Sequence, residues 1–221
     1  MHWLVLLLLL IGLCLPGAPR AADRAGDFDY YVLALSWNAA WCEDPSASGG
    51  AGRGAEQCDP SHDIGFTLHG LWPQHYAGWP EYCTTPERDP SRAETAAMVD
   101  IMGSSGLAWH EWKKHGRCSG LDPVEYFALA REAWEAIQRP EVLRRIRTPR
   151  RIAPKAIEQA FIEANPHLKP PLQPDGVTVT CKDRRFHEVR ICLSKALVPR
   201  PCTGATARDC AISNPLFPPI R

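Results

Sequence analysis

Apolar, branched and aromatic residues gather in short runs that predict the strands of this protein. Residues Phe28–Trp37, with the sequence FDYYVLALSW, suit a buried central strand. Residues Ile64–His69 predict a second strand, which ends at Gly70. Near the end of the chain, Val177–Cys181 and Phe186–Leu193 predict two further strands that are joined by a polar turn.

Apolar residues at helical spacing mark the stretches between these strands. Asp122, Pro123 and Glu125 provide a cap, a first-turn proline and a capping-box acid ahead of an amphipathic helix. Pro154 opens another helix, which carries Phe161 on its apolar stripe. Strands at both ends with helices between them predict an α+β fold, a single domain in which several helices pack on a central, mainly antiparallel sheet.

The first residues have the pattern of a secretory signal peptide. An unbroken aliphatic run, Leu4–Ile11, is followed by small and helix-breaking residues as far as Ala22. The run is shorter than the roughly 20 apolar residues that a membrane span needs. We therefore expect a signal peptide over residues 1–22, no membrane anchor, and a mature domain over residues 23–221 that is secreted or periplasmic.

The charge balance limits how this protein can hold a partner. The 221 residues include 25 Lys plus Arg and 25 Asp plus Glu, so the formal net charge is zero. Non-specific affinity for nucleic acid comes chiefly from neutralised phosphates, and bulk charge cannot supply it here. Any nucleic-acid partner is therefore expected to be held locally.

The cysteines predict a disulfide framework. Nine are present, and loss of Cys14 with the signal peptide leaves an even set in an exported chain. None of them forms a CxxC motif, which argues against a zinc ribbon or a thioredoxin-like redox site. Spacing alone leaves roughly a hundred pairings open. The set is Cys42, Cys58, Cys83, Cys118, Cys181, Cys192, Cys202 and Cys210.

Two segments concentrate unusual chemistry: FTLHGLWP at residues 66–73 and HEWKKHGRC at residues 110–118. At about 100° per residue, a helix places His110, Glu111, Lys114 and His115 within an arc of roughly 140°, on one face. Burying such a set without partners is costly, so we expect it to line a cleft. The tryptophans of the same helix would point the other way, into the core.

Two competing interpretations of the second segment are a solvated helix face and a zinc-protease HExxH motif. The zinc interpretation fails on spacing, because Lys114 occupies the position of the second ligand and His115 follows one residue later. The first segment adds His69 at the end of a predicted strand. Two histidines can divide proton transfer, and a neighbouring lysine can stabilise charge on a phosphoryl oxygen.

Together the two segments closely resemble the active-site signatures of the ribonuclease T2 family, secreted acid ribonucleases with little base preference. The early ALSW strand, Cys83 with Cys118, and the cysteine-rich tail from Cys181 to Cys210 also follow the family layout. The resemblance covers essentially the whole mature chain. It implies an endoribonuclease that cleaves single-stranded RNA.

The resemblance also implies a mechanism without metal or cofactor. His115 would act as general base on the substrate's own 2′-hydroxyl, and His69 as general acid to the departing 5′-oxygen. The product would be a 2′,3′-cyclic phosphate, which water opens to a 3′-phosphate. Glu111 and Lys114 would stabilise the five-coordinate phosphorus, and His110 would help to hold the phosphate. DNA lacks the nucleophile, so it would act as a substrate-like ligand that is not cut. No stable DNA partner is expected.

Substrate contacts are expected beside the first segment. Trp72 is a candidate stacking surface for a base, and Gln74 and Tyr76 are candidates for the same pocket. Six cations between Arg144 and Lys155 predict a solvated helix face rather than an RNA track.

The family layout also implies a disulfide pattern: Cys42–Cys58, Cys83–Cys118, and the nested pair Cys181–Cys210 and Cys192–Cys202. We expect a monomer. A non-catalytic, secreted RNA-binding or interaction protein on the same scaffold is the alternative. The presence of His69 together with Glu111, Lys114 and His115 argues against it.

Overall fold

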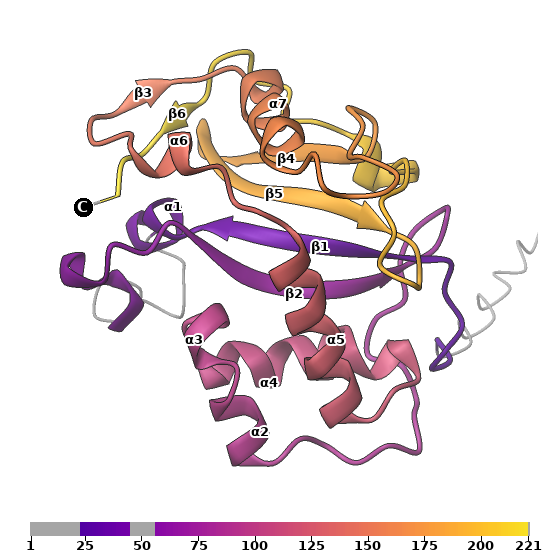
Figure 1. Cartoon of the computed structure of the whole chain (residues 1–221). Helices are drawn as coiled ribbons and strands as arrows, with labels where there is room; N and C mark the ends of the chain where they lie inside the picture. The colour runs from indigo at the N-terminus through magenta and orange to yellow at the C-terminus, as the bar shows by residue number, and fades with distance from the viewer. Residues whose placement is uncertain (1–22, 45–55, 221) are drawn as a thin grey trace, which may run out of the picture.

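A computed structural model describes residues 23–44 and 56–220 (Figure 1). The predicted signal peptide lies outside the described residues. Within the described part of the chain, no helix combines the length and apolar character needed to cross a membrane.

One twisted sheet organises the molecule. Its strands run in the order β2-β1-β5-β6-β3, and β4 pairs with β5 outside this path. Every pairing is antiparallel except that of β5 with β6. The fold is therefore the predicted single α+β domain with a mainly antiparallel sheet. The strands are β1 (Tyr30–Trp37), β2 (Phe66–Gln74), β3 (Arg150–Arg151), β4 (Val177–Lys182), β5 (Arg185–Leu193) and β6 (Leu216–Phe217).

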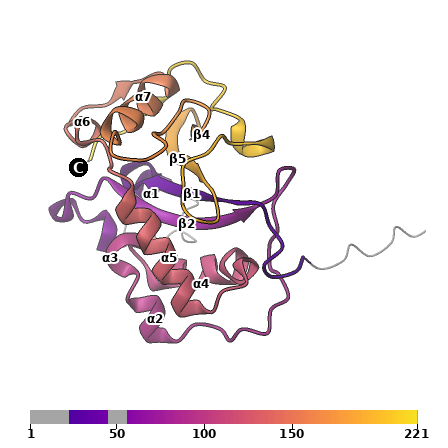
Figure 2. The same cartoon turned by 45° about the vertical axis from the view of Figure 1, so that its right-hand side comes forward.

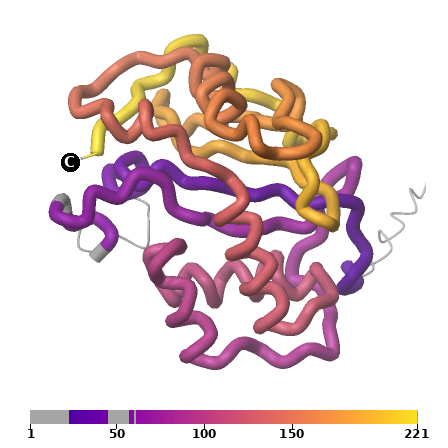
Figure 3. The backbone as a smooth tube through the Cα atoms, viewed as in Figure 1, coloured from indigo at the N-terminus to yellow at the C-terminus, as the bar shows by residue number. Residues whose placement is uncertain are grey.

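Helices α5 and α7 share one apolar core with the sheet face that carries Leu33 and Leu35. Figures 1 and 2 show α2 to α5 gathered beside β2, while α7 lies against β4. The C-terminal third of the chain contributes β3 to β6 to this same sheet, in which β5 lies beside β1 (Figure 3). The helices are α1 (Asn38–Glu43), α2 (Arg92–Ala96), α3 (Val99–Met102), α4 (Ser105–Lys114), α5 (Pro123–Ala136), α6 (Glu141–Arg144) and α7 (Pro154–Ala164).

Local sequence signals explain the two longest helices. Asp122 and Glu125 form the predicted capping box, and Pro123 occupies the first turn of α5. Pro154 likewise begins α7, which buries Phe161. Both helix predictions are confirmed.

The central strand β1 is buried on both faces, as predicted. Leu33, Leu35 and Trp37 point into the main core, whereas Tyr30 and Val32 join a smaller apolar cluster on the other face. This second face carries the candidate site.

Three local expectations are wrong. Strand β2 does not end at Gly70 but continues to Gln74. The two tryptophans of α4 do not both point into the core: Trp112 is fully buried, whereas Trp109 lies on the solvent side of the helix and is 42% exposed. The cations from Arg144 onward do not share a helix face, since they are spread over α6, the edge strand β3 and the start of α7.

Four disulfides staple the described chain, with the pairing that the family layout implies: Cys42–Cys58, Cys83–Cys118, Cys181–Cys210 and Cys192–Cys202.

Candidate active site

A β-bulge places His69. Residues of β2 pair with β1 in one register up to Leu68 and in another from Gly70 onward, so His69 is the extra residue between them. A bulge bends a strand and redirects a side chain, and bulges are common beside active sites.

The partner of His69 comes from β5, on the far side of β1. Ser36 of β1 pairs with Glu188 of β5, and Ala34 pairs with Arg190. Because Ala34 and Ser36 are small, the side chains of the outer strands can meet above them. The Nδ1–H of His69 donates to Glu188 Oε2 at 2.9 Å.

Arg190 fixes the carboxylate of Glu188. Its Nε and Nη2 donate to Glu188 Oε1 at 2.7 and 2.6 Å. The same guanidinium lies 5.2 Å from the centroid of the Trp72 ring. Glu188 is fully buried, so the His69 and Arg190 contacts supply the pairing that a buried charge requires.

Helix α4 brings Glu111 to the other side of His69. Trp72 Nε1 donates to Glu111 Oε2 at 2.6 Å, and Glu111 Oε1 lies 3.7 Å from His69 Nε2. Gly70 makes this approach possible: a Cβ there would lie 2.1 Å from Glu111 Oε2. The glycine of the HGLW segment is therefore needed for space.

His115 lies just beyond α4, at the start of a short 3-10 turn, Gly116–Ser119. A Cβ at Gly116 would come within 2.8 Å of the rings of Trp112 and Tyr126, so glycine lets the chain turn tightly against the core. Disulfide Cys83–Cys118 ties this turn to the loop that precedes α2.

The imidazoles of His69 and His115 flank one indole. The centroid of each lies 5.1 Å from that of Trp72. His115 is buried, and none of the described residues makes a hydrogen bond to its Nδ1. The bulge and the turn thus bring together histidines from distant parts of the sequence.

The surroundings of the two histidines shift their pKa values in opposite directions. Burial, with the positive charges of Lys114, His69 and His110, lowers the pKa of His115 to about 3. Burial also lowers the pKa of His69, but the hydrogen bond to Glu188 and the charges of Glu111 and Glu188 outweigh it and leave the pKa raised. The pKa of His69 therefore lies above its ordinary value and that of His115 well below it, so His69 binds a proton more readily than His115.

The two carboxyl groups differ as well. Burial raises the pKa of Glu111 to about 6, in spite of the nearby charge of His69. Burial acts the same way on Glu188, but the hydrogen bond to His69 and the positive charges around it bring the pKa down to about 2. Glu188 therefore remains ionised in mild acid, whereas Glu111 can carry a proton there.

The remaining expected site residues lie further out. Lys114 Nζ is 3.8 Å from Glu81 Oε2, and His110 is exposed on α4. Burial, with the charge of Lys114, lowers the pKa of His110. Gln74 is buried at the end of β2. Tyr76 is exposed and stacks on Tyr30 rather than on Trp72.

A cavity of about 180 Å³ opens beside His69, away from the indole. Its lining includes Ser36, Trp41, Leu107 and His187.

In the described part of the chain, no group of three or more His, Cys, Asp or Glu is arranged to hold a metal ion.

Glu188 and Arg190 were missed by sequence reasoning. Their signal lies within the predicted strand, where a charged residue on either side of Val189 interrupts an apolar run. A charge on a buried strand needs a partner, and His69 is that partner.

The fold and site define a class: a disulfide-stapled α+β protein in which two histidines with oppositely shifted pKa values flank a common tryptophan. The sequence matches the Ribonuclease T2 family over residues 28–202. The chain belongs to this family.

Individual relatives agree with that membership. A ribonuclease of Aeromonas hydrophila is 40% identical over 126 residues, which cover 57% of this chain and 54% of that protein. The chain spans about half the length of the curated relatives it matches. Among solved structures, an RNase-related protein from Calystegia sepium has a TM-score of 0.61 at 21% identity and covers 86% of this chain and 98% of its own. A mutant of RNase MC1 in complex with 5′-UMP has a TM-score of 0.61 at 20% identity, covering 81% and 95%. At these identities the structures establish the fold.

Proposed function

We propose that this protein is an endoribonuclease that cleaves single-stranded RNA through the two histidines at Trp72. The observation that supports it most is that His69 and His115 flank one indole in surroundings that shift their pKa values in opposite directions. Acid–base catalysis needs one group that gives a proton and one that accepts it.

The geometry supports one assignment of the two roles. Neutral His115 takes the proton of the 2′-hydroxyl, and the oxygen attacks the adjacent phosphorus. His69 is held through Nδ1 by Glu188, so its Nε2 carries the proton that passes to the departing 5′-oxygen. A 2′,3′-cyclic phosphate forms. Water then opens it to a 3′-phosphate with the two histidines in exchanged roles, and no step requires a metal ion.

Charge on the phosphoryl oxygens is stabilised from α4. Glu111, protonated in mild acid, donates a hydrogen bond to one oxygen, and Lys114 supplies a positive charge. His110, one residue before Glu111, helps to hold the phosphate. The raised pKa of His69 and the low pKa of His115 favour activity in the acid range.

The substrate lies along the second face of the sheet. The cavity beside His69 is large enough to admit part of a base, and the open part of Trp72 offers a stacking surface on the other side. Gln74 lies further along β2 and contributes to that side. The protein acts as a secreted or periplasmic monomer, and DNA is not cleaved because it lacks the 2′-hydroxyl.

Product analysis on poly(U) in EDTA tests the proposal. We expect cyclic-phosphate ends, and a loss of turnover of about 10²–10⁴-fold in His69→Ala and in His115→Ala. His62→Ala, at an exposed histidine of a short 3-10 turn, is the matched control and should retain full activity. Binding of poly(U) without cleavage would instead favour the non-catalytic alternative, and loss of activity in EDTA would favour a metal-dependent hydrolase.

A further inference from the structure

Two tyrosines and an arginine form a compact stack beyond the catalytic centre. The Arg200 guanidinium lies 4.3 Å from the ring centroid of Tyr30 and 5.1 Å from that of Tyr76. The two tyrosine rings stack with their centroids 6.3 Å apart. Tyr30 is the fully buried member of the stack, while Tyr76 is 57% exposed. Arg200 forms no ion pair with any carboxylate in the described part of the chain.

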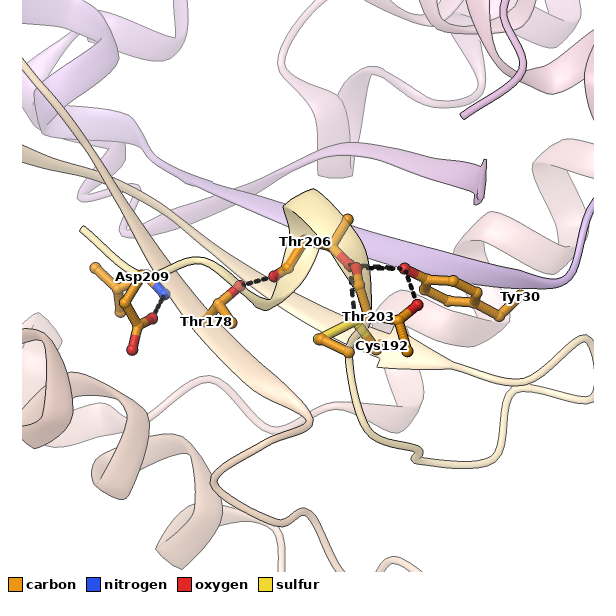
Figure 4. The surroundings of a disulfide bond; sticks show 8 residues. Tyr30, Thr178, Cys192, Thr203, Thr206 and Asp209 are labelled. Atoms are coloured by element: carbon orange, nitrogen blue, oxygen red, sulfur yellow. Dashed lines mark hydrogen bonds between the residues drawn. A yellow bond between two sulfur atoms is a disulfide. The ribbon is translucent and has the colours of Figure 1, made fainter. Parts of the chain in front are cut away.

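This stack is held rigidly from below. Tyr30 Oη lies 2.7 Å from Thr206 Oγ1, and Thr203 Oγ1 donates to Tyr30 Oη at 3.3 Å. Figure 4 shows the Tyr30 ring directed at this turn, next to Cys192 of the Cys192–Cys202 disulfide. The disulfide closes the loop that carries Arg200.

The exposed tyrosine is positioned by its backbone. Tyr76 N–H donates to Asp29 Oδ2 at 2.8 Å. A Cβ at Gly204 would lie 2.9 Å from the carbonyl oxygen of Tyr76, so the glycine allows the two loops to meet. An aromatic ring that is fixed in place and yet exposed has already lost the conformational entropy that binding would otherwise remove.

The stack lies on the same face of the sheet as the catalytic centre. Trp72 packs against the cluster that contains Tyr30 and Val32. Ala34, which pairs with Arg190, and Tyr30, which lies under Arg200, are four residues apart on β1, or roughly 13 Å. A single strand bound at Trp72 can therefore continue to Arg200 without leaving this face.

We propose that Arg200 and Tyr76 form a second nucleotide subsite, which binds a phosphate and a base of the same RNA strand outside the scissile linkage. The proposal rests on the function given above. The guanidinium presents a flat set of donors to phosphate oxygens, and the ring accepts any base by stacking. Such a subsite makes the protein prefer long strands over dinucleotides without introducing a base preference.

Binding of an uncleavable hexadeoxyuridylate, measured by fluorescence anisotropy, tests the subsite without catalysis. We expect Arg200→Gln to weaken binding about tenfold. The slope of log affinity against log salt should fall in magnitude by about 0.7, the value for one phosphate contact on a single strand. Arg200→Lys keeps the positive charge, so the salt slope should be retained. Part of the affinity should be lost, because the lysine ammonium lacks the flat guanidinium that stacks on the tyrosine rings. Arg145→Gln, at an exposed arginine that follows α6, is the matched control.

Cleavage gives the second measurement. A hexanucleotide with a single ribouridine among deoxyuridines has one cleavable linkage, and the matching dinucleotide lacks the distant phosphates. Arg200→Gln should lower kcat/KM about tenfold on the hexanucleotide and leave it unchanged on the dinucleotide. Unchanged binding and salt slope in Arg200→Gln would overturn the subsite, and so would an equal loss on both substrates. A wild-type protein that cuts neither substrate refutes the proposed function, and the anisotropy result then decides the subsite by itself.

Discussion

Glu188→Gln separates the charge of the buried carboxylate from its shape. The amide oxygen of this variant can still accept the Nδ1–H of His69, so the ring keeps its place, but the negative charge at 2.9 Å is lost. A hydrogen bond to a charged group contributes about 1.5–3 kcal/mol. At about 1.36 kcal/mol for each pH unit, the pKa of His69 should fall by roughly one to two units.

The sign of the effect follows from the role that we propose for His69. A general acid must be protonated, and the raised pKa keeps it so to higher pH. In Glu188→Gln the alkaline limb of kcat/KM should therefore move to lower pH by roughly one to two units. The acid limb, set by His115, should stay where it is.

The measurement is a pH–rate profile on a dinucleotide, together with an NMR titration of the His69 ring. Glu163→Gln, at an exposed residue of α7, is the matched control and should leave both unchanged. A thermal melt shows that the variant is folded at each pH. If the NMR titration gives the same pKa for His69 in Glu188→Gln and in the wild type, Glu188 does not set this pKa. If the pKa falls but the alkaline limb stays in place, our assignment of His69 as the acid is refuted.

Other predictions concern space and burial. Gly70→Ala places a Cβ 2.1 Å from Glu111 Oε2, so kcat should fall at least tenfold in a folded protein. The control is Gly106→Ala within α4, whose Cβ meets nothing closer than 3.4 Å. It should leave activity unchanged and be neutral or slightly stabilising in thermal melts. Burial raises the pKa of Glu158 to about 7. Because this folded pKa exceeds the ordinary value of 4.5, the contribution of Glu158 to stability is complete below pH 4.5 and is lost as the pH rises towards 7. Urea unfolding should show this loss, on the order of 2 kcal/mol, in the wild type and not in Glu158→Gln; equal curves for both proteins would contradict the assignment.

The sequence was informative wherever a signal is local. The aromatic run of β1 predicts a buried strand, and the capping box at Asp122 marks the start of α5 to the residue. The HGLW and HEWKKH segments resemble the signatures of the family by themselves, because an active site constrains residue types at short spacing. Such signals depend on neighbours within one or two turns of chain, which a sequence displays directly.

The tertiary structure decided what those residues can do. The bulge at His69, the small residues of β1 that let Glu188 reach it, and the exposure of Trp109 all depend on how strands and helices meet. His69 and Glu188 are separated by 119 positions in the chain. The pKa of a group depends on its burial and on the charges that face it from every neighbouring element. A sequence can name two histidines, but only the packing of distant segments raises the pKa of one of them and lowers that of the other.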